Sequence, residues 1–200
     1  MTPKIYKGVE LGEGVEIGDG VIIGLPPKGH SDGELKTVIG DNAIIRSHTT
    51  IYAGNRIGND FQTGHHVLIR ELNEIGNDVS VGTSTVVEHN VKIKDGVRIH
   101  SQAFIPEFSL LEEGAWIGPN VVLTNATYPC SINVKQTLKG PILRKNCRIG
   151  ANSTLLPGLE IGENSLIGAG SVVTKAVEAD SVIAGNPAIK INTTNNLPYE

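Results

Sequence analysis

The stretch IGNDFQTGHHVLIRELNEIGNDVS, residues 57–80, decides the fold. Its four units of six residues begin with Ile, Thr, Ile and Ile, and Gly, Asn and Asp recur between these positions. Followed along the chain, the spacing gives 25 positions, of which 24 hold Ile, Leu or Val and one holds Thr63. Random placement of the 56 Ile, Leu and Val residues would fill about 7 of them. The repeat therefore runs through nearly the whole chain.

A period of six fits neither the 3.6 residues of a helical turn nor the alternation of a simple strand. It fits short strands joined by tight corners, where Gly, Asn and Asp accept a positive φ. Three such strands close one triangular coil, so the sequence predicts an all-β, parallel β-helix of about eight coils with the aliphatic residues inside. We expect one domain over residues 1–190, with loops at 24–37 and 125–142 and a tail at 191–200.

Composition excludes several classes of protein. The formal charge of −4 argues against binding to nucleic acid, and no apolar run approaches the ~18 residues of a membrane span. We therefore expect a cytoplasmic protein. Cys130 and Cys147 have neither the number nor the spacing of a disulfide framework, so they are expected to be free thiols. Residues 135–190 carry 7 Lys and Arg against 4 Asp and Glu, a balance that favours a compact polyanionic ligand.

In such a coil, equivalent positions of successive turns lie above one another. One outer column holds Glu71, His89, Glu107 and Asn125, and it continues through Pro157 to Lys175 if the loop 125–142 replaces no side of the triangle. A second column stacks His48, His66, Ser84, Gln102 and Asn120, and His65 falls over Ser47 and Thr83. Polar residues are expected at corners for solvation alone, so position in a column does not establish a functional role.

His100 is a candidate proton acceptor. Its column neighbours are Gly82 and Gly118, and glycine above and below leaves a recess beside the imidazole. A neutral imidazole can take a proton from an amine or hydroxyl nucleophile at neutral pH. We estimate on the order of 10 Å between His100 and Glu107 within one chain, so one small site holding both needs a second subunit or a long substrate.

Two segments resemble a known family. The runs RIHSQAFIPE at 98–107 and EEGAWIGPNVVLTN at 112–125 resemble the nucleotide-sugar N-acetyltransferases of the hexapeptide-repeat, left-handed β-helix acyltransferase superfamily, above all those that acetylate dTDP-3-amino-3,6-dideoxyhexoses. The resemblance implies a left-handed coil, a homotrimer, and transfer of acetyl from acetyl-CoA to the amino group of a nucleotide-linked sugar. It places His100, Glu107 and Asn125 in the acceptor pocket. The family usually has Asp at the position of Ala126.

The C-terminal runs IGAGSVVTK at 167–175 and AGNPA at 184–188 resemble the segment where these acyltransferases hold coenzyme A between neighbouring subunits. The residues implied in binding acetyl-CoA are Gly168, Ala169, Gly170, Lys175, Asn186 and Lys190. Glycine and alanine allow close approach of the pantetheine chain, and lysines can meet the phosphates. The family often has Asp at the position of Ala176. No metal is expected, because the six His residues lack the spacing of a His metal site.

Three other functions remain as alternatives. One is O-acetylation of a small hydroxylated acceptor. Another is a metalloenzyme of the carbonic anhydrase type, a family that takes a pair of His residues five apart plus a third; no two of the six His residues here have that spacing. The last is a non-catalytic coil that presents an edge to a partner protein. Trp116 is a candidate interface anchor, and the loop with Tyr128, Lys135 and Lys139 is expected to reach a neighbouring chain or the nucleotide.

Overall fold

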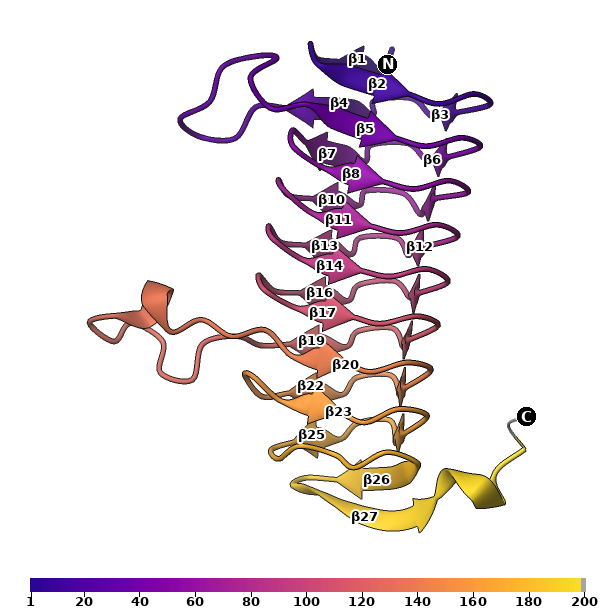
Figure 1. The fold of residues 1–200 in the computed structure, drawn as a ribbon, viewed down its shortest axis with the longest axis vertical. Helices are drawn as coiled ribbons and strands as arrows, with labels where there is room; N and C mark the ends of the chain where they lie inside the picture. Colours follow the sequence, from indigo (N-terminus) through magenta and orange to yellow (C-terminus); the bar gives the residue numbers. More distant parts are fainter. Residues whose placement is uncertain (199–200) are drawn as a thin grey trace.

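The chain forms a three-sided prism of stacked coils (Figure 1). The computed structural model describes residues 1–198. Sheet A consists of β1 (Lys4–Ile5), β4 (Ile22–Leu25), β7 (Thr50–Tyr52), β10 (Leu68–Ile69), β13 (Val86–Val87), β16 (Phe104–Ile105), β19 (Val122–Leu123), β22 (Thr154–Leu155) and β25 (Val172–Val173). Sheet B consists of β2 (Val9–Leu11), β5 (Thr37–Ile39), β8 (Arg56–Ile57), β11 (Glu74–Ile75), β14 (Lys92–Ile93), β17 (Leu110–Leu111), β20 (Ile142–Leu143) and β23 (Glu160–Ile161).

Sheet C forms the third side of the prism. It consists of β3 (Glu16–Ile17), β6 (Ile44–Ile45), β9 (Gln62–Thr63), β12 (Ser80–Val81), β15 (Arg98–Ile99), β18 (Trp116–Ile117), β21 (Arg148–Ile149), β24 (Leu166–Ile167), β26 (Ser181–Gly185) and β27 (Ala188–Thr193). Helical turns within residues 1–198 are the 3₁₀ segments η1 (Val134–Gln136) and η2 (Thr194–Asn196). None of the helices in this range is long and apolar enough to cross a membrane.

Strand register confirms the predicted stacking of each coil on the next. Leu68 pairs with Val86, and Val86 pairs with Phe104, in parallel. The inward residue of each hexad is buried, as Ile51 and Leu111 illustrate with no exposed surface. Because each inward side chain packs on the equivalent residue of the next coil, one continuous apolar core runs along the prism. The chain is a left-handed parallel β-helix, as expected.

The corners use left-handed backbone conformations. Asp60 and Asp78 adopt φ values of 57° and 51°, as the repeat predicts for Asn and Asp. Leu72 and Phe108 adopt φ values of 62° and 65°, although bulky side chains are strained there. Both side chains are exposed, at 44% and 47%. They lie on the corner between sheets A and B, directly after Glu71 and Glu107.

The loop between β19 and β20 leaves the prism and returns without disturbing it. Leu110 pairs with Ile142 just as Lys92 pairs with Leu110 one coil earlier, so the coil that contains the loop keeps the register although its chain is longer. At the base of the loop the Lys139 N–H donates to the Asn125 carbonyl at 2.9 Å, and the Gly158 N–H donates to the Lys139 carbonyl at 2.8 Å. The excess over a regular coil, 126–139, forms an arm that projects from the prism (Figure 1).

The C-terminal end departs from the repeat. β27 runs antiparallel to β26 and ends at Thr193, so residues 191–193 of the expected tail form a strand. η2 follows it, and residues 199–200 lie outside the described part of the chain. The other expected loop, 24–37, includes the last two residues of β4 and the first residue of β5.

Candidate active site

The column Glu71, His89, Glu107 and Asn125, called the ridge below, lies on the corner between sheets A and B. The strand pairs Leu68 with Val86 and Phe104 with Val122 fix its order. The Asn125 side-chain amide donates to the Glu107 carboxylate. Nδ1 of His89 lies 3.8 Å from Oε1 of Glu107 and 3.9 Å from Oε2 of Glu88. Three predicted neighbours of this column are therefore in one cluster.

Arg70 supplies the positive charge of the cluster. Its Nε and Nη2 donate to the two carboxylate oxygens of Glu71 at 2.9 and 3.0 Å, and its Nη1 lies 3.6 Å from Glu88. Burial, the largest single effect, raises the pKa of Glu71, but the hydrogen bonds from Arg70, a backbone hydrogen bond and the charges of Arg70 and His89 together hold this pKa below its usual value. The same hydrogen bonds raise the pKa of Arg70. This pair is therefore charged at neutral pH.

Two buried asparagines hold the turn that carries Arg70. The side-chain amides of Asn55 and Asn73 each donate to the Arg70 carbonyl at 2.8 Å. The Asn73 N–H in turn donates to the side-chain carbonyl of Asn55 at 3.0 Å. Both residues are 1% exposed or less, and buried, fully paired amides of this kind fix a local geometry. The ridge is thus supported from inside the prism.

His89 has an unused hydrogen-bonding atom. Within residues 1–198 its Nδ1 is buried and has no hydrogen-bond partner. The ring packs edge-on against Phe108, with 6.2 Å between the ring centroids. The Glu107 carboxylate beside Nδ1 would stabilise the imidazolium that forms when the other ring nitrogen takes up a proton. The arrangement is suited to removing a proton from a bound nucleophile at that other nitrogen.

One atom each from Glu88, His89 and Glu107 could also hold a cation, because these atoms lie within 4.8 Å of one another. A guanidinium already faces one of these two carboxylates, since Arg70 Nη1 lies 3.6 Å from Glu88 Oε2. The donor set is therefore partly neutralised by the protein itself.

The stacked pair His48 and His66, with ring centroids 4.9 Å apart, confirms the second predicted column.

His100 lies apart from the ridge within one chain. It follows β15 of sheet C, whereas Glu107 follows β16 of sheet A and lies on the far side of that sheet. The His100 ring packs against Trp116, with 4.5 Å between centroids. A recess of about 360 Å³ lies on the Gly82 side of His100, whereas Gly118, the other predicted neighbour, does not line it. The structure therefore brings Glu107 and Asn125 together with His89, and places His100 elsewhere.

Of the six C-terminal candidates, Lys175 and Lys190 line a second hollow of about 420 Å³, whereas Gly168, Ala169, Gly170 and Asn186 lie outside its lining. Lys175 is exposed and has no carboxylate within 4.0 Å in the described residues, whereas Lys190 lies 3.7 Å from Glu178. Both lysines can meet an anion at this hollow.

The predicted small residues have different roles. A Cβ at Gly168 would lie 2.8 Å from that of Ala184, so this glycine serves packing between β24 and β26. A Cβ at Gly170 would meet nothing within 4 Å, which leaves open space beside an exposed backbone. Ala169 is exposed, and Asn186 is exposed in the turn between β26 and β27. Gly170 and its neighbours are accessible to a ligand.

Arg70 and Glu88 are site residues that sequence reasoning missed. A signal was present, because the adjacent pairs Arg70-Glu71 and Glu88-His89 occupy equivalent positions in successive coils. Arg70 therefore stacks on Glu88, and Glu71 stacks on His89. Glu71 and His89 belong to the ridge, so Arg70 and Glu88 lie directly beside it.

Comparisons with known proteins agree with this fold. The family described as bacterial transferase hexapeptide (six repeats) matches residues 74–107 and 140–175. A galactoside O-acetyltransferase of Lactococcus lactis is 39% identical over 90 residues, which cover 42% of this chain and 44% of that protein. A serine acetyltransferase of Buchnera aphidicola is 34% identical over 115 residues, which cover 52% of this chain and 41% of that protein.

The chain spans less than half the length of these curated relatives. Over a longer range it is similar in fold to a solved Bacillus cereus protein, with a TM-score of 0.60, 23% identity, and coverage of 88% of this chain and 84% of the other. Residues 74–107 and 140–175 of this chain are therefore similar to the bacterial transferase hexapeptide family, and the relatives that the chain matches by sequence include acetyltransferases.

Proposed function

We propose that the protein transfers an acetyl group from acetyl-CoA to the amino group of a nucleotide-linked sugar. The observation that carries this proposal is the contact between Asn125 and Glu107 on the ridge, with His89 against the same carboxylate. An amide, a carboxylate and an imidazole within reach of one point can hold and deprotonate an amine. The acetyltransferases among the relatives support the class of reaction.

In the proposed reaction the sugar amine attacks the thioester carbonyl of acetyl-CoA. The new C–N bond forms as the C–S bond breaks, the amine proton passes to His89, and the CoA thiolate leaves and takes up a proton. Asn125 holds the acceptor through its amide, and Glu107 stabilises the protonated imidazole. Orientation of the two reactants can supply several kcal/mol of the barrier, and proton removal adds about 10²–10⁴-fold.

We assign acetyl-CoA to the C-terminal coils. Lys175 and Lys190 would meet its phosphates, and the exposed backbone at Ala169, Gly170 and Asn186 would lie along the pantetheine chain. The open space at Gly170 and the hollow beside both lysines support this assignment. Gly168 contributes by letting β24 and β26 pack closely.

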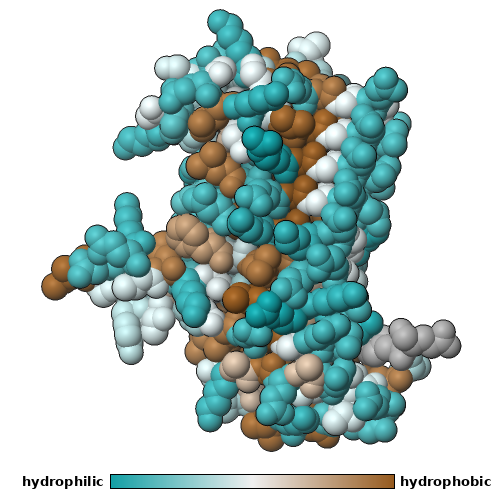
Figure 2. Space-filling view, in the orientation of Figure 1, coloured by the Kyte–Doolittle hydropathy of each residue, from teal (hydrophilic) through white to brown (hydrophobic). Residues whose placement is uncertain are grey.

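A homotrimer completes the proposal. The arm carries Tyr128 and Ile132 at 75% and 101% exposure, and Figure 2 shows hydrophobic atoms at its outer end. Exposed apolar side chains at the end of a projecting arm support contact with another chain. A neighbouring copy could also bring its His100 toward the ridge. The sequence predicts that His100 and Glu107 share one small site only if a second subunit or a long substrate joins them.

O-acetylation of a sugar hydroxyl is a second candidate, favoured by the similarity to a galactoside O-acetyltransferase. Mass spectrometry of products decides between the two. The full chain is incubated with acetyl-CoA and a panel of dTDP- and UDP-linked amino sugars, their hydroxyl counterparts, serine and a galactoside. Acetylation of amino sugars alone supports the proposal. Acetylation of hydroxyl acceptors with amino sugars untouched contradicts it.

A further inference from the structure

One column on sheet C is almost entirely glycine. The residue that follows the inward side chain is glycine in the successive coils from Gly18 to Gly168, except at Arg46 and His100. A Cβ at Gly64 or Gly82 would lie 2.3 Å from a backbone nitrogen of the next coil, so these positions admit only glycine. Arg46 and His100 stand at either end of the gap that these two glycines make.

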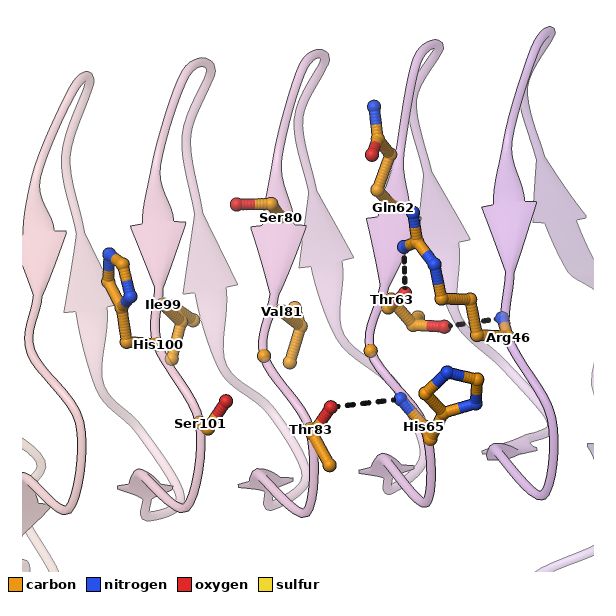
Figure 3. Close-up of a pocket in the computed structure, with 12 residues that line it drawn as sticks. Arg46, Gln62, Thr63, His65, Ser80, Val81, Thr83, Ile99, His100 and Ser101 are labelled. Atoms are coloured by element: carbon orange, nitrogen blue, oxygen red, sulfur yellow. Dashed lines mark hydrogen bonds between the residues drawn. The ribbon is translucent and has the colours of Figure 1, made fainter.

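This gap is the recess of about 360 Å³ (Figure 3). Arg46 and His65 lie at one end and His100 at the other, with Ser80, Thr83 and Ser101 between them. Coils are ~4.8 Å apart, so the two ends are about 14 Å apart along the prism. The recess is therefore long enough for a ligand larger than a single small ion.

Arg46 is held in place by the one position that breaks the aliphatic repeat. The Thr63 hydroxyl accepts the Arg46 N–H at 2.9 Å, and the Thr63 carbonyl accepts from Nη1 of the guanidinium. An aliphatic residue at 63 would remove the hydroxyl bond. The departure from the repeat therefore fixes the residue that carries the charge of the recess.

The charge of Arg46 is not balanced by the protein. Within residues 1–198 no carboxylate lies within 4.0 Å of its guanidinium, whereas Arg70, Arg98 and Arg144 each have acidic partners there. The side chain is half-buried, and among the described residues its one side-chain hydrogen bond is from Nη1 to the Thr63 carbonyl. His65 bonds Ser47 through Nδ1 at 2.7 Å and lines the recess beside Arg46. An unpaired guanidinium beside imidazole and hydroxyl groups matches a phosphoryl group.

We propose that the recess binds the phosphoryl group of an organic phosphate, with Arg46 and His65 as its main donors. The same chemistry is offered by a nucleoside diphosphate, by coenzyme A and by inorganic phosphate. The length of the recess favours the nucleoside diphosphate, whose second end would reach His100. The proposal concerns binding and does not rest on the proposed acetyl transfer.

Isothermal titration calorimetry tests it with three probes: UDP, coenzyme A and inorganic phosphate. The proteins are the wild type, Arg46→Gln, and Arg56→Gln as a matched control on the outer face of sheet B. We expect saturable binding of UDP that weakens at least ~10-fold in Arg46→Gln and stays within about twofold in Arg56→Gln, as loss of a charged hydrogen bond implies. Equal affinity of wild type and Arg46→Gln for every probe, or no binding of any probe, overturns the proposal.

Trp116 is the single tryptophan and lies against His100, so its fluorescence reports on that end of the recess. We expect UDP to change the emission and inorganic phosphate to leave it unchanged. A response to coenzyme A alone, with UDP silent in both assays, contradicts the assignment to a nucleoside diphosphate. If Arg46→Gln fails to fold by circular dichroism, His65→Gln takes its place, with the same weakening expected.

The outcome is separable from the proposed acetyl transfer. UDP binding that depends on Arg46, in a protein that acetylates nothing in the panel, supports the recess and counts against the transferase. If the protein acetylates amino sugars but its affinity for UDP is the same with and without Arg46, the result supports the transferase and counts against the recess.

Discussion

Asn125 donates its side-chain amide to the carboxylate of Glu107, one coil away. The contact exists because the two residues hold equivalent positions in successive coils, so their Cα positions stack on one corner of the prism. It is also the point where the arm leaves, since Lys139 closes the base of the loop on the Asn125 carbonyl. One residue therefore joins the ridge to the arm, which ties the geometry of the candidate site to that of the loop.

Removing the imidazole on the ridge tests which histidine serves the reaction. We expect His89→Ala to lower kcat for acetyl transfer by about 10²–10³-fold, because the proton acceptor beside Glu107 is lost. His100→Ala is expected to cost less, since His100 does not contact the ridge within one chain. Steady-state kinetics on both variants measures this. An equal or larger loss in His100→Ala would show that a neighbouring copy supplies His100 to the site.

Excising residues 126–139 tests the arm. The deletion gives the coil between Leu110 and Ile142 the same length as its neighbours, so we expect a folded prism with a circular dichroism spectrum close to that of the wild type. Gly140 would then follow Asn125 at a corner where the preceding coil has Phe108 at positive φ, which glycine accepts readily. Acetyl transfer is expected to be lost. A shortened protein with full activity would mean that the arm has no part in the reaction.

The ion pair of Arg70 with Glu71 predicts a pH dependence of stability. The folded-state pKa of Glu71 is lowered, so its contribution is present above the ordinary glutamate pKa and is lost as the pH falls through the folded value. Urea unfolding should therefore show wild type more stable than Glu71→Gln at pH 7, with the difference shrinking toward pH 3. A difference that is the same at both pH values would contradict a charged pair.

The two thiols should differ sharply in reactivity. Burial raises the pKa of Cys147 to about 12, while Cys130 is exposed on the arm. Because the thiolate is the reactive form, we expect a thiol reagent at pH 8 to label one cysteine rapidly in the folded protein and the second only in denaturant. Peptide mapping should find the rapid label on Cys130. Rapid labelling of both would indicate that the prism opens near Cys147.

The repeat predicted most of the fold. An inward aliphatic residue must recur in every coil, so the hexad spacing determined the strand register, the core and the stacking of Glu107 on Asn125. The base of the arm could not be predicted, because loop length does not say which residue returns to the corner, and here Lys139 does. The strand at residues 191–193 has no hexad signal, since it pairs antiparallel to β26 outside the repeat.

The candidate site was predicted in part. The column through His89, Glu107 and Asn125 followed from the spacing, but the choice between His89 and His100 needed distances between side chains. The role of Arg70 depends on rotamers that let one guanidinium meet both Glu71 and Glu88. Spacing alone could have shown that the pairs stack, although not that they form an ion-pair network.

The most direct measurement is a crystal structure of the protein with coenzyme A and a dTDP-3-amino-3,6-dideoxyhexose. We predict the sugar amine within hydrogen-bonding distance of the His89–Glu107–Asn125 cluster and the phosphates of coenzyme A near Lys175 and Lys190. An amine bound away from the ridge, with His89 and Glu107 facing only solvent, would contradict the account.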